Sequence, residues 1–258
     1  MNILVSSSRG VGLHNLIKED VGEWGGLSTK VISGGTFDLT TIAAKEIISS
    51  LGHTENPPHV YFMAGIPDIT TLIKDKYFGQ NHREVILENT EEQTISKVKD
   101  EIIKADKEIR DAGAKPIFCT ITNMSISQHN TFLHTHKKTD ILLHQDSYNT
   151  MQSHLDNILK EINDTIITHN RNTGVATPHC HSIIRKHRGR SGAGYYITDF
   201  SALYDGLHGS EKAQKLWAKA IKGAIKKIRT SSVRMPRPHQ KGPGEGKSEG
   251  PTRSNCII

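Results

Sequence analysis

The chain has 258 residues, a formal net charge of +6, 35% hydrophobic residues and a mean hydropathy of −0.47. No window approaches the roughly 18 consecutive apolar residues that a membrane-spanning helix needs, so the composition excludes such a helix. The three cysteines are too few and too scattered for a disulfide framework or a Cys-x-x-Cys zinc site. Because the first residues lack the basic segment and the apolar run of a signal peptide, we expect a cytoplasmic protein that begins at Met1.

Composition separates a tail, residues 229–258, from the rest of the chain. This tail holds six Lys or Arg against two Glu and is rich in Pro and Gly. Such a segment buries too little apolar surface to offset its ordering entropy, so we expect a folded domain over 1–228 and a disordered basic tail over 229–258. The tail, with a basic loop predicted over 185–190, offers weak contact with nucleic acid as an alternative to a purely solubilising role.

Within residues 1–228, short β-rich runs alternate with longer segments of helical period. This alternation is typical of an α/β domain with a central parallel sheet. Four runs are predicted as strands: 2–5, 29–32, 59–64 and 115–121.

The helical segments carry start and stop signals. Asp38 is placed to cap a helix that ends near Leu51, and Thr90 with Gln93 three residues later forms a capping box. Gly113 is the expected end of the helix that Thr90 begins. Apolar stripes predict two further helices, over 151–166 and 210–228.

Small and polar residues follow the first three predicted strands. In an open parallel sheet, the loops after the carboxyl ends of the strands converge on one edge, where ligands bind. The segments concerned are Ser6–Gly10, Ser33–Thr36 and Gly65–Asp68, and a fourth, Asp205–His208, precedes the last helix. Together they offer a serine on a tight turn, glycine amides, and an Asp three residues before a His.

These residue types suit nucleophilic acyl transfer. A serine hydroxyl is a poor nucleophile at neutral pH, so a histidine within about 3 Å must accept its proton and a carboxylate must orient that histidine. The spacing Asp-x-x-His allows the second contact within one turn of the chain. The developing oxyanion needs donors worth about 3–4 kcal/mol each, which amides at a glycine turn can supply.

In this order the four segments resemble the sequence blocks of the SGNH/GDSL hydrolase superfamily, and they span the chain from Ser6 to His208. The resemblance implies a three-layer α/β/α sandwich with a central parallel sheet, of the flavodoxin-like kind. The Ser-Ser-Ser turn, the terminal Asp-Gly-Leu-His and the following Trp217 look most like the SGNH-type esterase domains encoded by eukaryotic retroelements.

The resemblance also implies a role for each matching residue. Ser8 would be the nucleophile, His208 the general base and Asp205 the group that orients the base. The amides of Ser8 and Gly35 would form the oxyanion hole. The substrate-binding residues that it implies are Gly65 and Asp68.

Two positions depart from the family pattern. The family's Gly-Asp before the serine is Ser6-Ser7 here, so it stays open which of Ser6, Ser7 and Ser8 is the nucleophile. The family's oxyanion asparagine falls on Pro67, which has neither a side-chain amide nor a backbone N–H. Losing one donor slows acyl transfer by about a hundredfold or more.

Structural roles are also open for these residues. Ser6 to Ser8 fit a polar turn, and Asp205 with His208 fits a helix entry that carries a surface histidine. Asp68 fits a helix cap or a loop partner.

Three functional hypotheses follow. The first is a serine esterase or deacylase that acts on a small-molecule or lipid ester and needs no cofactor. The second is a catalytically degenerate binding domain of the same fold, which associates with nucleic acid in a mobile element. The third, a nucleotide-dependent enzyme, rests only on the turn Gly10-Val11-Gly12, which lacks the third glycine of a dinucleotide fingerprint.

The His-rich segments 134–136 and 179–181 lack the spaced partners of a zinc site, so no metal is expected.

Overall fold

A computed structural model describes residues 1–22, 25–52, 54–75, 82–137, 145–188 and 195–233. Its centre is a four-stranded sheet in the order β2-β1-β3-β6, in which every neighbouring pair is parallel. The strands are β1 (Asn2–Ser6), β2 (Leu27–Val31), β3 (His59–Met63) and β6 (Lys115–Phe118). The predicted parallel α/β sheet is confirmed, with strand ends that differ from the prediction by one to three residues.

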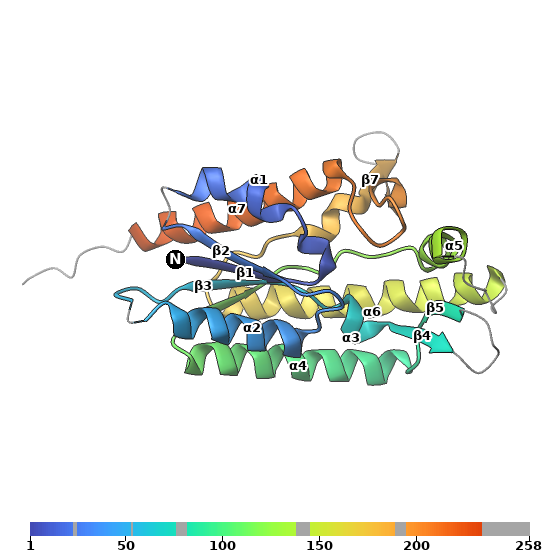
Figure 1. The fold of residues 1–258 in the computed structure, drawn as a ribbon, viewed down its shortest axis with the longest axis horizontal. Helices are drawn as coiled ribbons and strands as arrows, with labels where there is room; N and C mark the ends of the chain where they lie inside the picture. The colour runs from blue at the N-terminus through green and yellow to red at the C-terminus, as the bar shows by residue number, and fades with distance from the viewer. Residues whose placement is uncertain (23–24, 53, 76–81, 138–144, 189–194, 234–258) are drawn as a thin grey trace, which may run out of the picture.

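Helices cover both faces of this sheet (Figure 1). One face carries α1 (Leu13–Val21) and α7 (Glu211–Val233), and the other carries α2 (Phe37–Ser50), α4 (Glu91–Asp111) and α6 (Gln145–Asn172). Successive strand residues point to opposite faces. Ile3 and Val5 therefore join the core under α2, α4 and α6, while Leu4 joins the core under α1 and α7. The three-layer architecture is as predicted.

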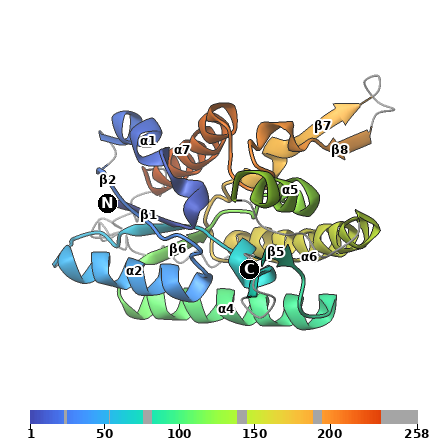
Figure 2. The same ribbon diagram turned by 45° about the vertical axis from the view of Figure 1, so that its right-hand side comes forward.

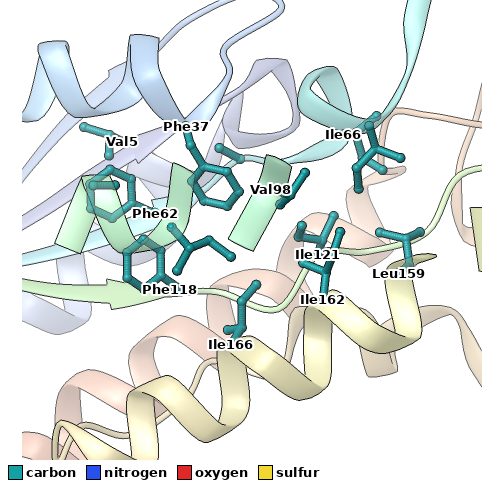
Figure 3. Close-up of a cluster of buried hydrophobic side chains, with 14 of the residues drawn as sticks. Val5, Phe37, Phe62, Ile66, Val98, Phe118, Ile121, Leu159, Ile162 and Ile166 are labelled. Carbon is teal, nitrogen blue, oxygen red and sulfur yellow. The ribbon is translucent and has the colours of Figure 1, made fainter. Parts of the chain in front are cut away.

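Aromatic rings fill the centre of the first of these cores (Figure 3). Phe62 of β3 and Phe118 of β6 stack with ring centroids 5.1 Å apart, and Phe37 of α2 meets Phe118 edge-on at 6.0 Å. Ile162 and Ile166 of α6 pack on the same cluster and are fully buried. This packing fixes α2 and α6 against the sheet.

The helix signals are borne out in α4 but not in α2. Thr90 and Gln93 form the predicted capping box, and Gly113 follows the end of α4 with a φ of 81°. The cap of α2, however, is Thr36, whose hydroxyl accepts from the Leu39 amide at 3.3 Å. The prediction for Asp38 was wrong because this residue lies inside the first turn, where its carboxylate pairs with Lys104 at 2.8 Å.

Several elements were not expected from the sequence. They are α3 (Ile66–Ile69), α5 (Ile126–Lys137), the hairpins β4 (Thr71–Asp75) with β5 (His82–Ile86) and β7 (Arg185–Arg188) with β8 (Tyr195–Thr198), and the 3-10 turns η1 (Ser8–Gly10), η3 (Cys180–Ile184) and η4 (Phe200–Ala202). The β7–β8 hairpin projects from the fold (Figure 2). It corrects the basic loop predicted over 185–190, because four of those residues pair as a strand.

Two further expectations concern the C-terminal boundary of the domain and the absence of a membrane-spanning helix. Helix α7 continues to Val233, past the boundary expected at residue 228, and the rest of the predicted tail lies outside the described residues. Among the described helices, none combines the length and the apolar character needed to cross a bilayer.

The outer edge of β6 is closed by two asparagine side chains of α6 instead of a further strand. Asn170 accepts from the Phe118 amide at 3.2 Å and donates to the Phe118 carbonyl at 2.7 Å. Asn163 makes the same pair of bonds with Ile121, at 2.6 and 3.0 Å. Each primary amide thus satisfies one buried N–H and one buried C=O, as a neighbouring strand would.

We expect Asn170→Ala to lower the free energy of unfolding by about 2–4 kcal/mol, because it leaves the N–H and C=O of Phe118 buried without partners. Urea unfolding followed by circular dichroism measures the change. The exposed neighbour Asn172 provides the control, Asn172→Ala, which should stay within about 0.5 kcal/mol of the wild type. An Asn170 variant as stable as this control would contradict the closed-edge interpretation.

Candidate active site

Three side chains from distant parts of the chain form a hydrogen-bonded row at the carboxyl end of β1. Ser8 opens the 3-10 turn that follows β1, and its Oγ lies 2.9 Å from Nε2 of His208, a residue 200 positions later. The other ring nitrogen, Nδ1, lies 2.6 Å from Oδ2 of Asp205. Asp205 and His208 belong to the loop that precedes α7. The arrangement has the order hydroxyl, imidazole, carboxylate.

The partners fix where the protons lie. An ionised carboxylate only accepts, so Nδ1 of His208 carries a hydrogen and donates it to Asp205. In the neutral ring Nε2 is then an acceptor, and the Ser8 hydroxyl donates to it. His208 therefore holds the tautomer that can receive a proton from Ser8.

Asp205 is ionised because its loop folds around the carboxylate. Its side chain is only 3% exposed, and burial alone would raise its pKa. The His208 ring and the backbone amides of His208 and Leu207, at 2.6 and 2.9 Å, donate to it and instead lower the pKa to about 2. Asp205 therefore stays charged at neutral pH.

Gly206 allows this loop to lie against the start of α5. Its φ is 80°, and a Cβ here would come within 2.6 Å of the His129 backbone nitrogen and 2.8 Å of the Ser125 carbonyl oxygen. The Ser125 amide donates to the Gly206 carbonyl at 2.8 Å. Only glycine fits both the backbone conformation and the contact.

His129 on α5 is a second histidine beside Asp205, and nothing in the sequence marked it. Its Nδ1 donates to the Asp205 carbonyl at 3.1 Å and lies 3.8 Å from the carboxylate oxygen Oδ2. Burial lowers the pKa of His129, against the opposing charge of Asp205, so its ring is biased toward the neutral form. His129 therefore holds the backbone of the Asp205 loop.

Arg9, next to Ser8, is buried and joins the serine turn to the segment after β6. Its guanidinium donates to the carbonyls of Thr122 and Asn123, the latter at 3.1 Å. Burial lowers its pKa to about 9, while Asp205 acts in the opposite direction, so Arg9 is still a cation at neutral pH. Trp217 of α7 donates to the Thr122 hydroxyl at 3.0 Å, which ties the last helix to the same segment.

The three serines differ in their surroundings. Ser6 and Ser7 are buried, and the Ser6 hydroxyl has no hydrogen-bond partner among the described residues. Ser8 is partly exposed and is the one whose hydroxyl contacts His208. The geometry thus distinguishes the three positions that the sequence left open.

The groups that could donate hydrogen bonds to an oxyanion are backbone N–H groups. The Gly35 amide, expected in this role, donates to the Ile32 carbonyl at 3.0 Å and is engaged in a turn. Gly34 directly precedes Gly35. Among the described residues, no acceptor is found for the backbone N–H of Ser8 or for that of Gly34. Pro67 lies in the first turn of α3 and brings no donor. The sequence pattern gave two adjacent glycines and could not tell which amide was occupied.

Gly65 and Asp68 make structural contacts. Gly65 has a φ of 114° and lies so close to Ile121 that a Cβ would meet its side chain at 2.3 Å. Both carboxyl oxygens of buried Asp68 accept from the Phe37 amide, at 3.2 and 3.1 Å, so Asp68 caps the first turn of α2. This is the helix-cap role that the sequence had left open for Asp68.

Among the described residues, no three His, Cys, Asp or Glu side chains cluster in the manner of a metal site.

No protein-family model and no curated protein sequence matches this chain. Solved structures match it by fold. A candidate acylhydrolase from Bacteroides fragilis superposes with a TM-score of 0.54 at 14% identity, over 88% of this chain and 86% of the other. A GDSL-like lipase from Bacteroides thetaiotaomicron gives 0.53 at 14% identity, over 88% of each chain. The chain therefore has the fold of SGNH/GDSL acylhydrolases, as the four sequence blocks predicted.

The Asp68 contact predicts a pH dependence of stability. Burial raises the pKa of Asp68 to about 7, although the Phe37 amide acts in the opposite direction. An unfolded aspartate has a pKa of about 3.9. Between these values the unfolded chain releases a proton that the folded chain keeps, so the wild type loses stability as pH rises from about 4 to about 7.

Asp68→Asn keeps an acceptor for the Phe37 amide but does not titrate, so it should remove this loss. We expect the free energy of unfolding of Asp68→Asn, relative to wild type, to increase across this pH range in urea experiments. The exposed carboxylate Asp146, changed to Asn, is the control and should track the wild type. Parallel profiles for wild type and Asp68→Asn would show that Asp68 has no raised pKa.

Proposed function

We propose that this chain is a serine esterase or deacylase that works through an acyl-enzyme on Ser8. The observation that carries the proposal is the contact between Ser8 Oγ and His208 Nε2, with Asp205 behind the ring. Acyl transfer requires a serine hydroxyl beside a histidine that can accept its proton, and a carboxylate that orients this histidine. The fold shared with acylhydrolases supports the same reaction class.

The mechanism follows from the hydrogen bonds. As Ser8 Oγ attacks the ester carbonyl carbon, Nε2 of His208 takes the hydroxyl proton and Asp205 stabilises the imidazolium. The tetrahedral intermediate then expels the alcohol, which receives that proton from His208. Water, deprotonated by His208, attacks the acyl-enzyme and releases the acid and free Ser8.

The amides of Ser8 and Gly34 are our candidates for the oxyanion hole. Both belong to the turns that follow β1 and β2, which are neighbouring strands. Gly35 can contribute only if its turn bond to Ile32 opens. The side-chain donor that the family carries is replaced by Pro67, so a slow enzyme is expected.

Finer assignments remain predictions. An ester substrate agrees with the acylhydrolase neighbours. The sequence analysis alone supports the small-molecule or lipid nature of that ester, the likeness to retroelement-encoded domains and a cytoplasmic location. The same holds for the alternative, a degenerate binding domain that associates with nucleic acid. Exposed Arg185, Lys186 and Arg188 lie on β7, and this alternative requires a gel shift that weakens with added salt.

A fluorophosphonate probe tests the proposal directly, because it reacts with an activated serine. We expect wild type to be labelled and to hydrolyse p-nitrophenyl acetate. Ser8→Ala should abolish labelling, and His208→Ala should lower kcat by about 10⁴-fold. Ser7→Ala, which removes a neighbouring hydroxyl, should still be labelled. Absence of labelling in wild type, or its persistence in Ser8→Ala, would refute the assignment.

The missing donor predicts that activity can be raised. Pro67→Asn supplies both a backbone N–H and a side-chain amide at the position of the family's oxyanion residue, and we expect kcat to rise about tenfold or more. Pro67→Ala restores only the backbone N–H and serves as the matched control, with a smaller gain. The measurement is steady-state hydrolysis of p-nitrophenyl acetate. Equal rates for the two variants would mean that the side chain at position 67 does not reach the oxyanion.

A further inference from the structure

An exposed tyrosine lies directly against His208, the proposed general base. The ring of Tyr204 stacks on the His208 ring with centroids 5.8 Å apart and an interplanar angle of 20°, yet Tyr204 is 64% exposed. Its backbone amide donates to the His208 carbonyl at 3.0 Å, which holds the two residues together. Large aromatic side chains at a protein surface are usually more covered than this, so the free face of Tyr204 is available to a ligand.

Two rings of α5 extend this surface away from His208. Phe132 meets Tyr204 edge-on, with centroids 6.4 Å apart, and His136 stacks on Phe132 at 4.3 Å. Phe132 is half-buried and His136 is exposed. Tyr204, Phe132 and His136 therefore form an aromatic row that begins at the site and continues along one side of α5.

The mechanism decides which part of an ester lies on this row. His208 gives its proton to the oxygen of the departing alcohol, so that oxygen must come within hydrogen-bond reach of Nε2. The acyl group instead stays bonded to Ser8, with its oxygen directed at the backbone amides. The alcohol portion is thus the part of the substrate on the His208 side, where Tyr204 stands.

We infer that the aromatic row is the binding surface for the alcohol portion of the substrate, and that it selects alcohols that carry an aromatic ring. This inference rests on the proposed function, because it uses the direction in which His208 delivers its proton. A flat ring gains from stacking or edge contact on Tyr204 and Phe132 in addition to the area it buries, whereas a methyl group does not reach them. The expected preference is about tenfold in kcat/KM.

The experiment compares two acetate esters whose alcohols have closely similar acidity, methyl acetate and benzyl acetate. Wild type should hydrolyse benzyl acetate with about tenfold higher kcat/KM, mainly through a lower KM. Tyr204→Ala should bring the ratio of the two kcat/KM values, benzyl acetate over methyl acetate, down to about one, and circular dichroism of the same preparation shows that the variant is folded. Tyr204→Phe keeps the ring and should keep the preference. Ile103→Ala, which removes an equally exposed apolar side chain on α4, is the control and should change neither ester.

Each result has one meaning. If Tyr204→Ala slows both esters equally, Tyr204 only positions His208 and the inference is overturned. If Tyr204→Ala changes the rate of neither ester, the row does not contact the alcohol and the inference is again overturned. Fluorophosphonate labelling of the same preparations separates these failures from failure of the proposed function. A wild type that is labelled but unselective overturns the inference alone, and a wild type that is neither labelled nor active overturns both.

Discussion

The hydrogen bond between Ser8 and His208 depends on the layer of helices that lies beside it. The two residues are 200 positions apart and belong to loops that join different elements to the sheet. Helix α1 follows the Ser8 turn and α7 follows the His208 loop, and the two helices pack against each other on one face of the sheet (Figure 1). An ion pair between Lys222 and Asp20 joins their outer surfaces. A shift of α7 along α1 would therefore separate the base from the hydroxyl.

Beneath this contact the interior is polar and charged. Arg9, Asp205 and His129 are all buried. Arg9 donates to the backbone of the segment after β6, whereas His129 and Asp205 both bond to the backbone of the loop before α7. Buried charges cost desolvation energy, which their partners offset only when the geometry is good. We therefore expect these residues to contribute little to net stability. Their effect is to hold the turn after β1, the segment after β6 and the loop before α7 in one arrangement.

The sequence predicted those parts of the structure that depend on local signals. The alternation of strand and helix patterns, the capping box at Thr90 and the stop at Gly113 are all short-range, and they were correct. The cap of α2 was wrong because Thr36 and Asp38 are both good caps, and only the path of the backbone chooses between them. The two hairpins were missed because their strands are short and lack a clear alternation of apolar residues.

The residues of the site likewise fall into those that local sequence signals predict and those that only tertiary packing brings together. Asp205 and His208 are close in sequence, so their pairing follows from spacing, and the family pattern points to Ser8 as their partner. His129, Arg9 and Tyr204 come near the site only through tertiary packing, and no local pattern distinguishes them from other histidines, arginines and tyrosines in the chain. Whether the Gly34 or the Gly35 amide is occupied is likewise a property of the folded turn.

The asparagines that close β6 also limit how this sheet can grow. A strand from another chain could pair with β6 only by displacing Asn163 and Asn170 and breaking the four hydrogen bonds that they make with Phe118 and Ile121. Unprotected strand edges are the places where β proteins aggregate or exchange strands. At the edge of β6, these side chains of α6 therefore oppose the addition of a strand from another chain. They do so without a covering strand and without a charged side chain.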